Sequence, residues 1–317
     1  MTISERRLRH LLAVVEHGHF GRAAGALNIS QPALSKSIQA LEAEVGVTLL
    51  DRKPKGIALT VFGDLVVRRS KELNTAKEDL KREIDLLAGM GIGSVKVALG
   101  PYPSVISGYP AVARMLALYP KVNAMVHVAS WRDVAKQVAS GVVDIGIAEL
   151  GSVQDDQQFT TELIGQHSAR FFCRPGHPLL SRTSVSITDL LGFPWISTRF
   201  PARLALGLPR PLGAAGTIDL STGEFVPAVE IDVPMRLVEL LANSDALTMA
   251  TLTMMESDLR SGQVALLPNV LPIKAGYGFI YLKNRSLPPA ALAFMKVVRV
   301  VEAEIVERER VAERHYR

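Results

Sequence analysis

The stretch FGRAAGALNISQPALSKSIQ, residues 20–39, has the pattern of two helices joined by a short polar turn. Apolar residues recur on one stripe of the second helix and predict a buried face, formed by Leu34, Ile38, Leu41 and Val45. The opposite stripe carries side chains that can reach phosphates and base edges: Pro32, Ser35, Lys36 and Gln39. The stretch therefore predicts a helix-turn-helix that reads DNA. The alternative is an ordinary helical hairpin whose polar face is solvated.

The start of the second helix has residues that favour a helix N-terminus. Ser30 can accept a hydrogen bond from a first-turn amide, and Pro32 is tolerated where amides have no intrahelical partner. Small residues at 23–25 allow the two helices to lie close together. An earlier apolar stripe predicts a third helix, with Leu8, Leu11, Leu12 and Val15 on its buried face. Three helices would share one small core.

A basic ribbon follows the helices. LLDRKPKGIALT, residues 49–60, is typical of a β-hairpin with cations at its tip, where it can hold DNA phosphates. With this wing included, residues 5–63 resemble the DNA-binding domain of LysR-type transcriptional regulators. The matching segments are RRLRHLLAVVEHGHFGRAAGALNISQPALSKSIQALEAEVGVTLLDR and GIALTVFG.

The resemblance implies a winged helix-turn-helix and a set of DNA-binding residues. These are Arg22, Ser30, Gln31, Pro32, Ala33, Ser35, Lys36 and Gln39, with Arg52, Lys53 and Lys55 in the wing. The chain departs from the family pattern around Phe20, where His19 and Gly21 replace two hydroxyl residues. Leu50 stands where the family commonly has a phenylalanine.

A long helix is predicted after the wing. Residues 61–88 contain no proline and repeat apolar residues seven apart, at Val66, Leu73, Leu80 and Leu87. This seam predicts pairing with a second copy of the chain, whereas the alternative is one amphipathic helix lying on its own domain. GMGIG, residues 89–93, ends the helix. We therefore expect a DNA-binding domain at 1–60, a linker and dimerisation helix at 61–90, and an effector-binding domain at 91–317.

The remainder alternates short apolar strands with helices, which favours an α/β fold with a largely parallel sheet. The expected strands are 94–100, 121–129, 143–149, 169–174, 194–198, 228–233, 245–251 and 277–283. The expected helices are Tyr109–Tyr119, Trp131–Ser140, Pro234–Ala242 and one from Pro289 onward. The LysR resemblance implies two Rossmann-like lobes of the periplasmic-binding-protein type with a cleft between them. Lobe I would take about 91–162 and 266–317, and lobe II about 163–265.

Ligands in such folds bind beyond the carboxyl ends of strands, near helix N-termini. The candidate effector-binding residues at these places are Pro101, Tyr102, Pro103, Ser104, Val105, Trp131, Glu149, Ser197, Thr198, Arg199, Phe200, Met249 and Thr251. Hydroxyls of Ser104 and Thr198 would donate to an anionic effector such as a carboxylate. Glu149 would repel an anion unless it accepts from an effector hydroxyl. Each candidate also has a structural alternative, such as Ser104 capping a helix.

Composition agrees with a DNA-binding regulator. The formal charge of +5 and a pI of about 9.3 suit a polyanion partner. Without a signal peptide or an apolar stretch of membrane length, the chain is expected in the cytoplasm, away from membranes. The single cysteine, Cys173, lies in an apolar run and is expected to be a buried, inert thiol rather than half of a peroxide-sensing pair.

No catalytic motif is found, so we expect neither an enzyme nor a cofactor nor a bound metal. A secreted solute-binding protein would share the two-lobed fold but would need a signal peptide. The sequence thus predicts a LysR-type regulator that binds double-stranded DNA at a dyad, as a homodimer or a dimer of dimers, and answers to a small molecule. RNA polymerase is considered as a further partner. The alternative is an architectural DNA binder without effector control.

Overall fold

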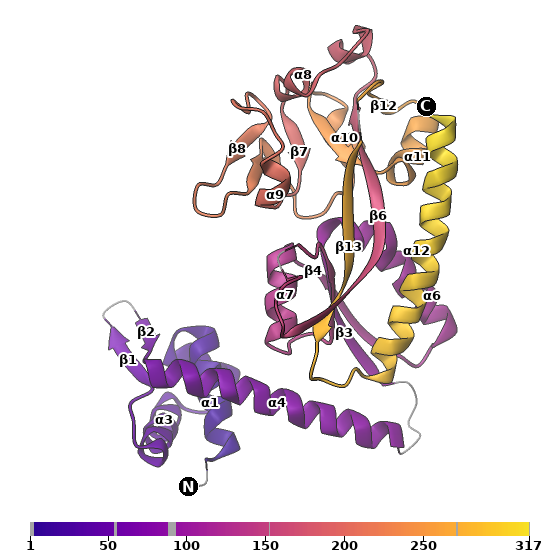
Figure 1. Cartoon of the computed structure of the whole chain (residues 1–317). Coiled ribbons are helices and arrows are strands. Elements are labelled where there is room, and N and C mark those ends of the chain that lie inside the picture. Colours follow the sequence, from indigo (N-terminus) through magenta and orange to yellow (C-terminus); the bar gives the residue numbers. More distant parts are fainter. Residues whose placement is uncertain (1–2, 54–55, 88–92, 152, 271, 317) are drawn as a thin grey trace. The chain divides into compact units, whose positions relative to one another are not determined.

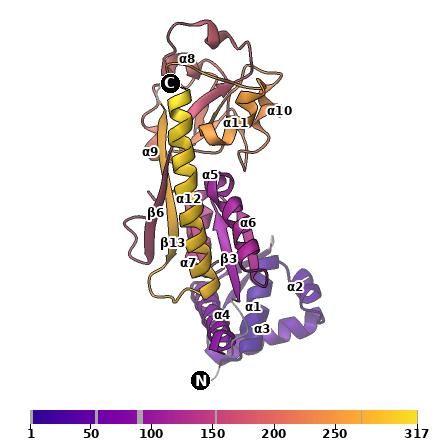
Figure 2. The same cartoon turned by 90° about the vertical axis from the view of Figure 1, so that its right-hand side faces the viewer.

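The computed structural model describes residues 3–53, 56–87, 93–151, 153–270 and 272–316. The chain divides into two compact units, residues 1–84 and 85–317. Figures 1 and 2 show the elements of each unit in two views. Across the described ranges, no helix is both long and apolar enough to cross a membrane.

Three helices form the core of the first unit: α1 (Glu5–His17), α2 (Phe20–Ala26) and α3 (Gln31–Val45). The predicted stripe of α3 is confirmed, since Leu34, Ile38 and Leu41 are buried. They pack with Leu11 and Val14 of α1 in one core. Ala23 and Ala24 are buried as well, so α2 lies close against its neighbours.

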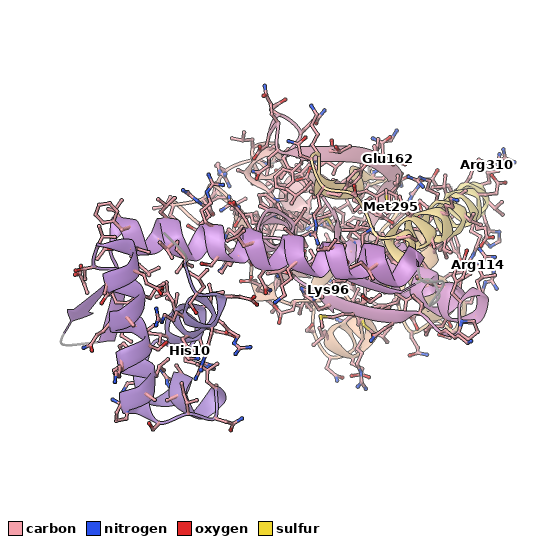
Figure 3. All side chains as sticks on the ribbon, turned by 90° about the horizontal axis from the view of Figure 1, so that it is seen from below. His10, Lys96, Arg114, Glu162, Met295 and Arg310 are labelled. Atoms are coloured by element: carbon pink, nitrogen blue, oxygen red, sulfur yellow. The ribbon has the colours of Figure 1, made fainter. Side chains whose placement is uncertain are left out.

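A two-stranded wing follows, with β1 (Leu50–Lys53) paired antiparallel to β2 (Gly56–Leu59). Glu42 of α3 fixes the entry to β1, because its carboxylate accepts hydrogen bonds from the amides of Leu49 and Leu50 at 2.7 and 3.2 Å. The helix α4 (Val61–Leu87) then runs unbroken, as Figure 3 shows. This confirms the long helix expected from the heptad pattern.

The second unit has two lobes joined by crossing strands. The first lobe contains β3 (Ser94–Leu99), α5 (Pro101–Pro103), the π-helical turn η1 (Ser104–Gly108), α6 (Tyr109–Leu118), β4 (Asn123–Val128), α7 (Trp131–Ala139) and β5 (Ile145–Ala148). Its strands β4, β3 and β5 are parallel, as alternating strands and helices predict. Their apolar side chains form the core of this lobe with Phe279 and Phe294.

The second lobe has a separate core around Phe171, Trp195 and Phe225. Its elements are the 3₁₀ turn η2 (Pro178–Ser181), α8 (Ile187–Leu191), β7 (Trp195–Ser197), α9 (Ala202–Ala205), β8 (Gly216–Ile218), β9 (Phe225–Pro227), β10 (Val229–Glu230), α10 (Leu237–Leu241), β11 (Leu247–Ala250), α11 (Leu252–Arg260) and β12 (Ala265–Leu266). Strands β10, β7 and β11 are again parallel.

Two long strands connect the lobes: β6 (Phe159–Cys173) and β13 (Ile273–Leu282) pair antiparallel along the whole length of β13 and lie side by side in Figure 1. They join the sheets of both lobes into one nine-stranded order. Helix α12 (Pro289–His315) lies along β6 and carries buried residues on one face for its full length (Figure 2). The two-lobed α/β fold predicted from the sequence is confirmed.

Several predicted elements were wrong in extent. The strand expected at 228–233 is only Val229–Glu230, and the one expected at 277–283 begins at Ile273. The strand expected at 169–174 begins ten residues earlier, because pairing with β13 extends β6 through the polar run TTELIGQHS. The helix expected at Pro234–Ala242 is only Leu237–Leu241, since Arg236 has a left-handed backbone with φ of 56° and interrupts a regular helix. The predicted bounds of the domains and lobes stay predictions.

Cys173 is fully buried in β6, as expected. Burial raises the pKa of its thiol to about 12, so the thiolate that reacts with oxidants is scarce at neutral pH. The interpretation of Cys173 as an inert thiol is therefore supported.

Candidate functional site

The N-terminal half of α3 presents a polar, exposed surface. Ser30 caps the helix, since its Oγ accepts from the Ala33 amide at 3.4 Å. Of the predicted DNA-binding residues, those exposed to solvent are Arg22, Ser30, Gln31, Pro32, Ala33, Lys36 and Gln39, whereas Ser35 is half-buried. The structure thus brings these side chains onto the outer side of α2 and α3. Lys55 and the side chains of Arg52 and Lys53 lie outside the described residues.

The structure explains how α2 is capped although His19 and Gly21 replace the hydroxyl residues of the family pattern around Phe20. The Nδ1 atom of His19 accepts a hydrogen bond from the Gly21 amide at 3.0 Å and so caps α2 in place of a hydroxyl residue. A side chain at position 21 would crowd the imidazole, because a Cβ there would lie 3.2 Å from two ring atoms. His19 and Gly21 therefore act as a pair that starts α2 and leaves Arg22 exposed.

Helix α1 is tied to α3 by a buried histidine. His10 Nδ1 lies 2.7 Å from the Ser37 hydroxyl, on the side of α3 away from Lys36 and Gln39. Burial, with the charges of Arg6 and Arg9, lowers the pKa of His10, so its ring is neutral near pH 7. This hydrogen bond fixes α3, the predicted reading helix, against α1.

A cavity of about 150 Å³ lies between the lobes of the second unit. Its wall includes most of the effector-binding residues predicted from the sequence: Pro101, Tyr102, Pro103, Trp131, Glu149, Thr198, Arg199, Phe200, Met249 and Thr251. The lining is predominantly apolar. These residues come from the carboxyl ends of strands and the starts of helices, where open α/β sheets bind ligands.

Three predicted residues are not part of the cavity wall. Ser104 is fully buried, and its hydroxyl donates to the Pro101 carbonyl at 2.6 Å, so it holds the turn before η1. Ser197 is also buried and donates to the Thr198 carbonyl at 2.8 Å. Val105 is half-buried on η1 and is absent from the wall. The alternative that Ser104 caps the following helix is wrong as well, because η1 has no side-chain cap and the Ser104 hydroxyl donates backward to Pro101.

The sequence did not reveal the cavity residues on the crossing strands. His167, Ala169, Ile273, Ala275 and Tyr277 line the cavity from β6 and β13. Additional wall residues that were missed are Ile106, Pro201, Leu204 and Leu208. A usable signal was present in His167, a basic residue inside a strand, and in Glu302 and Glu309, which lie seven apart on an otherwise apolar helical face.

His167 is the centre of a buried polar network. Its Nε2 lies 2.6 Å from Glu302 Oε1 and its Nδ1 lies 2.9 Å from Glu309 Oε2. Tyr277 donates to the other Glu302 oxygen at 2.8 Å and stacks on the imidazole, and Thr253 donates to Glu309 at 3.1 Å. Burial alone would lower the pKa of His167, but these hydrogen bonds and the two carboxylate charges raise it to about 9. The ring is therefore an imidazolium at neutral pH.

Three side-chain contacts close the lobes over the cavity. The Tyr102 hydroxyl donates to the Met249 carbonyl at 3.0 Å, from α5 to β11. Arg132 of α7 pairs with Glu224 at 3.1 Å, and Arg203 of α9 pairs with Glu149 at the end of β5. Each contact joins the first lobe to the second. Their opening or closing would change the access of a ligand to the cavity.

An exposed polar helix in a winged three-helix unit, followed by a two-lobed α/β unit with an interlobe cavity, defines a ligand-responsive DNA-binding regulator. Residues 6–64 match the family model described as "Bacterial regulatory helix-turn-helix protein, lysR family", and residues 89–301 match that described as "LysR substrate binding domain". The chain belongs to the LysR family. It is a LysR-type DNA-binding transcriptional regulator with an effector-binding domain.

Similar proteins agree with this membership. The "SDS degradation transcriptional activation protein" of Pseudomonas sp. (strain ATCC 19151) is 35% identical over 298 residues, which cover 92% of this chain and 94% of the relative. The crystal structure of full-length CbnR with its target DNA covers 94% of this chain and 99% of its own, at 20% identity and a TM-score of 0.59. Full-length LysG from Corynebacterium glutamicum with bound effector Arg covers 95% and 98%, at 16% identity and a TM-score of 0.58. At these identities the two structures show the shared fold.

Proposed function

We propose that this regulator binds an interrupted dyad near promoters in the cytoplasm, as a homodimer or a dimer of dimers, and that a small molecule in the interlobe cavity controls it. The observation that carries the DNA-binding part is the exposed polar side of α3, with Lys36 and Gln39 opposite a buried apolar stripe. Lysine donates to phosphates or guanine, and glutamine can pair with adenine. RNA polymerase is a further proposed partner.

The apolar seam of α4 supports dimerisation. Leu73, Leu80 and Ile84 are 63%, 58% and 55% exposed on the single chain, although they share the seam predicted from the heptad pattern. A second α4 would cover these side chains and hold two reading helices at a fixed separation. Two reading helices held at a fixed separation require a DNA site whose two half-sites have the same spacing and dyad symmetry.

The cavity supports effector control. Residues of both lobes line it, so a ligand inside it would contact both and favour one relative lobe arrangement. Its wall carries the hydroxyl side chains of Tyr102, Thr198, Thr251 and Tyr277. Of the two hydroxyl donors predicted for an organic anion, Ser104 is buried outside the wall and Thr198 lies in it. An architectural DNA binder without effector control would leave the cavity unused.

The DNA-binding part is tested by footprinting and titration on DNA upstream of the gene and of its divergent neighbour. Lys36→Ala and Gln39→Ala should weaken operator binding more than binding to random DNA, with about 1–3 kcal/mol lost at the operator for a base contact. Lys121 is an exposed lysine of the second unit. Lys121→Ala removes the same charge as Lys36→Ala and should change neither operator binding nor binding to random DNA. Equal losses on operator and random DNA for Gln39→Ala would show that Gln39 does not read a base.

A further inference from the structure

The cationic side chains of the cavity wall are already engaged by carboxylates. Both ring nitrogens of His167 face Glu302 and Glu309. Arg199 lies 2.8 Å from Glu230, 3.3 Å from Asp219 and 4.0 Å from Glu224. In each group the acids outnumber the base. An anionic ligand would therefore enter a wall whose positive charges are already neutralised or exceeded.

Glu149 gives the wall an unsatisfied acceptor. Its Oε1 accepts from Arg203 and, at 2.7 Å, from the Gly151 amide. Its Oε2 is covered from solvent and has no hydrogen-bond partner among the described residues. A buried carboxylate oxygen without a donor is unfavourable, and a ligand donor would relieve it. The terminal torsion of a glutamate is soft, so the carboxylate can turn this oxygen toward the cavity.

The volume of the cavity sets the size of the ligand body that it can bury. An engineered apolar cavity of about 150 Å³ in another protein binds benzene, so this one fits a body of about one ring. Tyr102, Trp131 and Phe200 supply aromatic surface around that space. The apolar lining favours an aromatic or compact aliphatic body over a sugar or a nucleotide.

We infer that the effector carries a hydrogen-bond donor, an ammonium or a hydroxyl group, on a ring-sized apolar body, and that Glu149 holds this donor. The inference rests on the proposed function of the cavity as the effector site. It replaces the organic anion favoured by the sequence with a neutral or cationic hydrogen-bond donor. Arg203 and the ligand would then compete for Glu149. The Arg203–Glu149 ion pair joins the two lobes, so a ligand that takes its place would weaken this interlobe contact.

The test compares benzylamine, benzyl alcohol and benzoate, which share one ring and differ in the attached group. Binding to the full-length protein is followed by calorimetry and by tryptophan fluorescence, since Trp131 lines the cavity. Ligands this small bind at millimolar concentrations. Benzylamine and benzyl alcohol should bind at least tenfold tighter than benzoate. Comparison of the first two shows whether the donor is charged.

Two variants have opposite expected effects. Glu149→Gln keeps the shape of the side chain but removes its charge, so benzylamine binding should weaken at least tenfold while benzoate binding does not weaken. Arg203→Met frees the carboxylate and should strengthen benzylamine binding. The Arg203 side chain is 52% exposed, so its replacement should leave the fold of the lobe intact. Benzoate binding tighter than benzylamine, or benzylamine binding unchanged in both variants, would overturn the inference.

A third variant separates this inference from the proposed function. Leu204→Trp fills the cavity from α9 and should abolish binding of all three probes, with an unchanged far-ultraviolet circular dichroism spectrum and unfolding transition of the second unit as the check on folding. Probes that bind equally well to Leu204→Trp occupy another site, which contradicts the cavity as the effector site. If none of the three probes binds the unmodified protein at about 10 mM, the inference that the effector has a ring-sized body is overturned.

Discussion

At the scale of single residues, His167 links the cavity to the stability of the second unit. Its folded pKa of about 9 is above the ordinary value of 6.5. A raised pKa of this kind contributes stability that is complete below about pH 6.5 and is lost as the pH rises through about 9. We therefore expect the unfolding free energy of the second unit to fall by about 3 kcal/mol across this window.

Urea unfolding followed by tryptophan fluorescence measures this loss. Both tryptophans of the chain, Trp131 and Trp195, are in the second unit, so the signal excludes the DNA-binding unit. Glu309→Gln removes one of the two carboxylates that raise the pKa of His167 and should shrink the pH-dependent loss. If the two proteins lose stability in parallel from pH 6.5 to pH 9, His167 is not the titrating group.

Gly63, in the first turn of α4, sets how closely this helix approaches the wing. A Cβ at this position would lie 2.0 Å from the Leu49 carbonyl oxygen, so a side chain requires the backbone to shift. We expect Gly63→Ala to destabilise the first unit by about 1–3 kcal/mol. Faster hydrogen exchange of the β1 and β2 amides would measure this loss of stability.

Gly25 of α2 is the matched control. A Cβ there would meet nothing within 4 Å, so Gly25→Ala should leave exchange unchanged or slow it, since alanine favours helices. Wing amides that exchange at the unmodified rate in Gly63→Ala would mean that α4 and the wing do not depend on this close approach.

At the scale of elements, α4 is expected to be the dimer contact. Leu80→Asp places a charge in the apolar seam and should weaken the dimer at least tenfold, about 1.4 kcal/mol or more. Sedimentation at a series of protein concentrations measures the change. Lys71→Asp alters a charge at another exposed position of α4 and should leave the association constant close to that of the unmodified protein. A dimer unaffected by Leu80→Asp would place the interface elsewhere.

At the scale of the whole second unit, the interlobe contacts decide how often the cavity opens. Arg132→Met removes the nearer of two arginines that pair with Glu224, at 3.1 Å against 4.0 Å for Arg199. The Glu224 side chain is only 7% exposed, so the closed arrangement loses stability. We expect amides at the lobe boundary to exchange about tenfold faster, which corresponds to about 1.4 kcal/mol.

The control for this prediction is Arg114→Met. Arg114 of α6, labelled in Figure 3, pairs with Glu304 of α12 at 2.8 Å. That ion pair does not bridge the lobes across the cavity, so its loss should leave exchange at the lobe boundary as it is. Equal effects of the two variants would mean that the Arg132 contact does not control opening.

Much of the fold follows from local patterns. The buried stripe of α3, the cap at Ser30 and the long α4 each depend on residues within a few turns of one another, and all three are as predicted. The alternation of strands and helices likewise predicted the α/β second unit. Predictions failed where distant partners decide the outcome: β6 is extended by β13, more than a hundred residues away.

The sequence by itself determined the family, the reading helix and the part of the cavity wall that comes from strand ends and helix starts, since periodicity locates those positions. Only the tertiary structure decided the charge of the cavity. Arg199 meets Asp219 and Glu230, Glu149 meets Arg203, and His167 meets two glutamates from α12. Each pairing depends on long-range packing of residues 20 to 142 positions apart, which leaves no periodic signal in the chain.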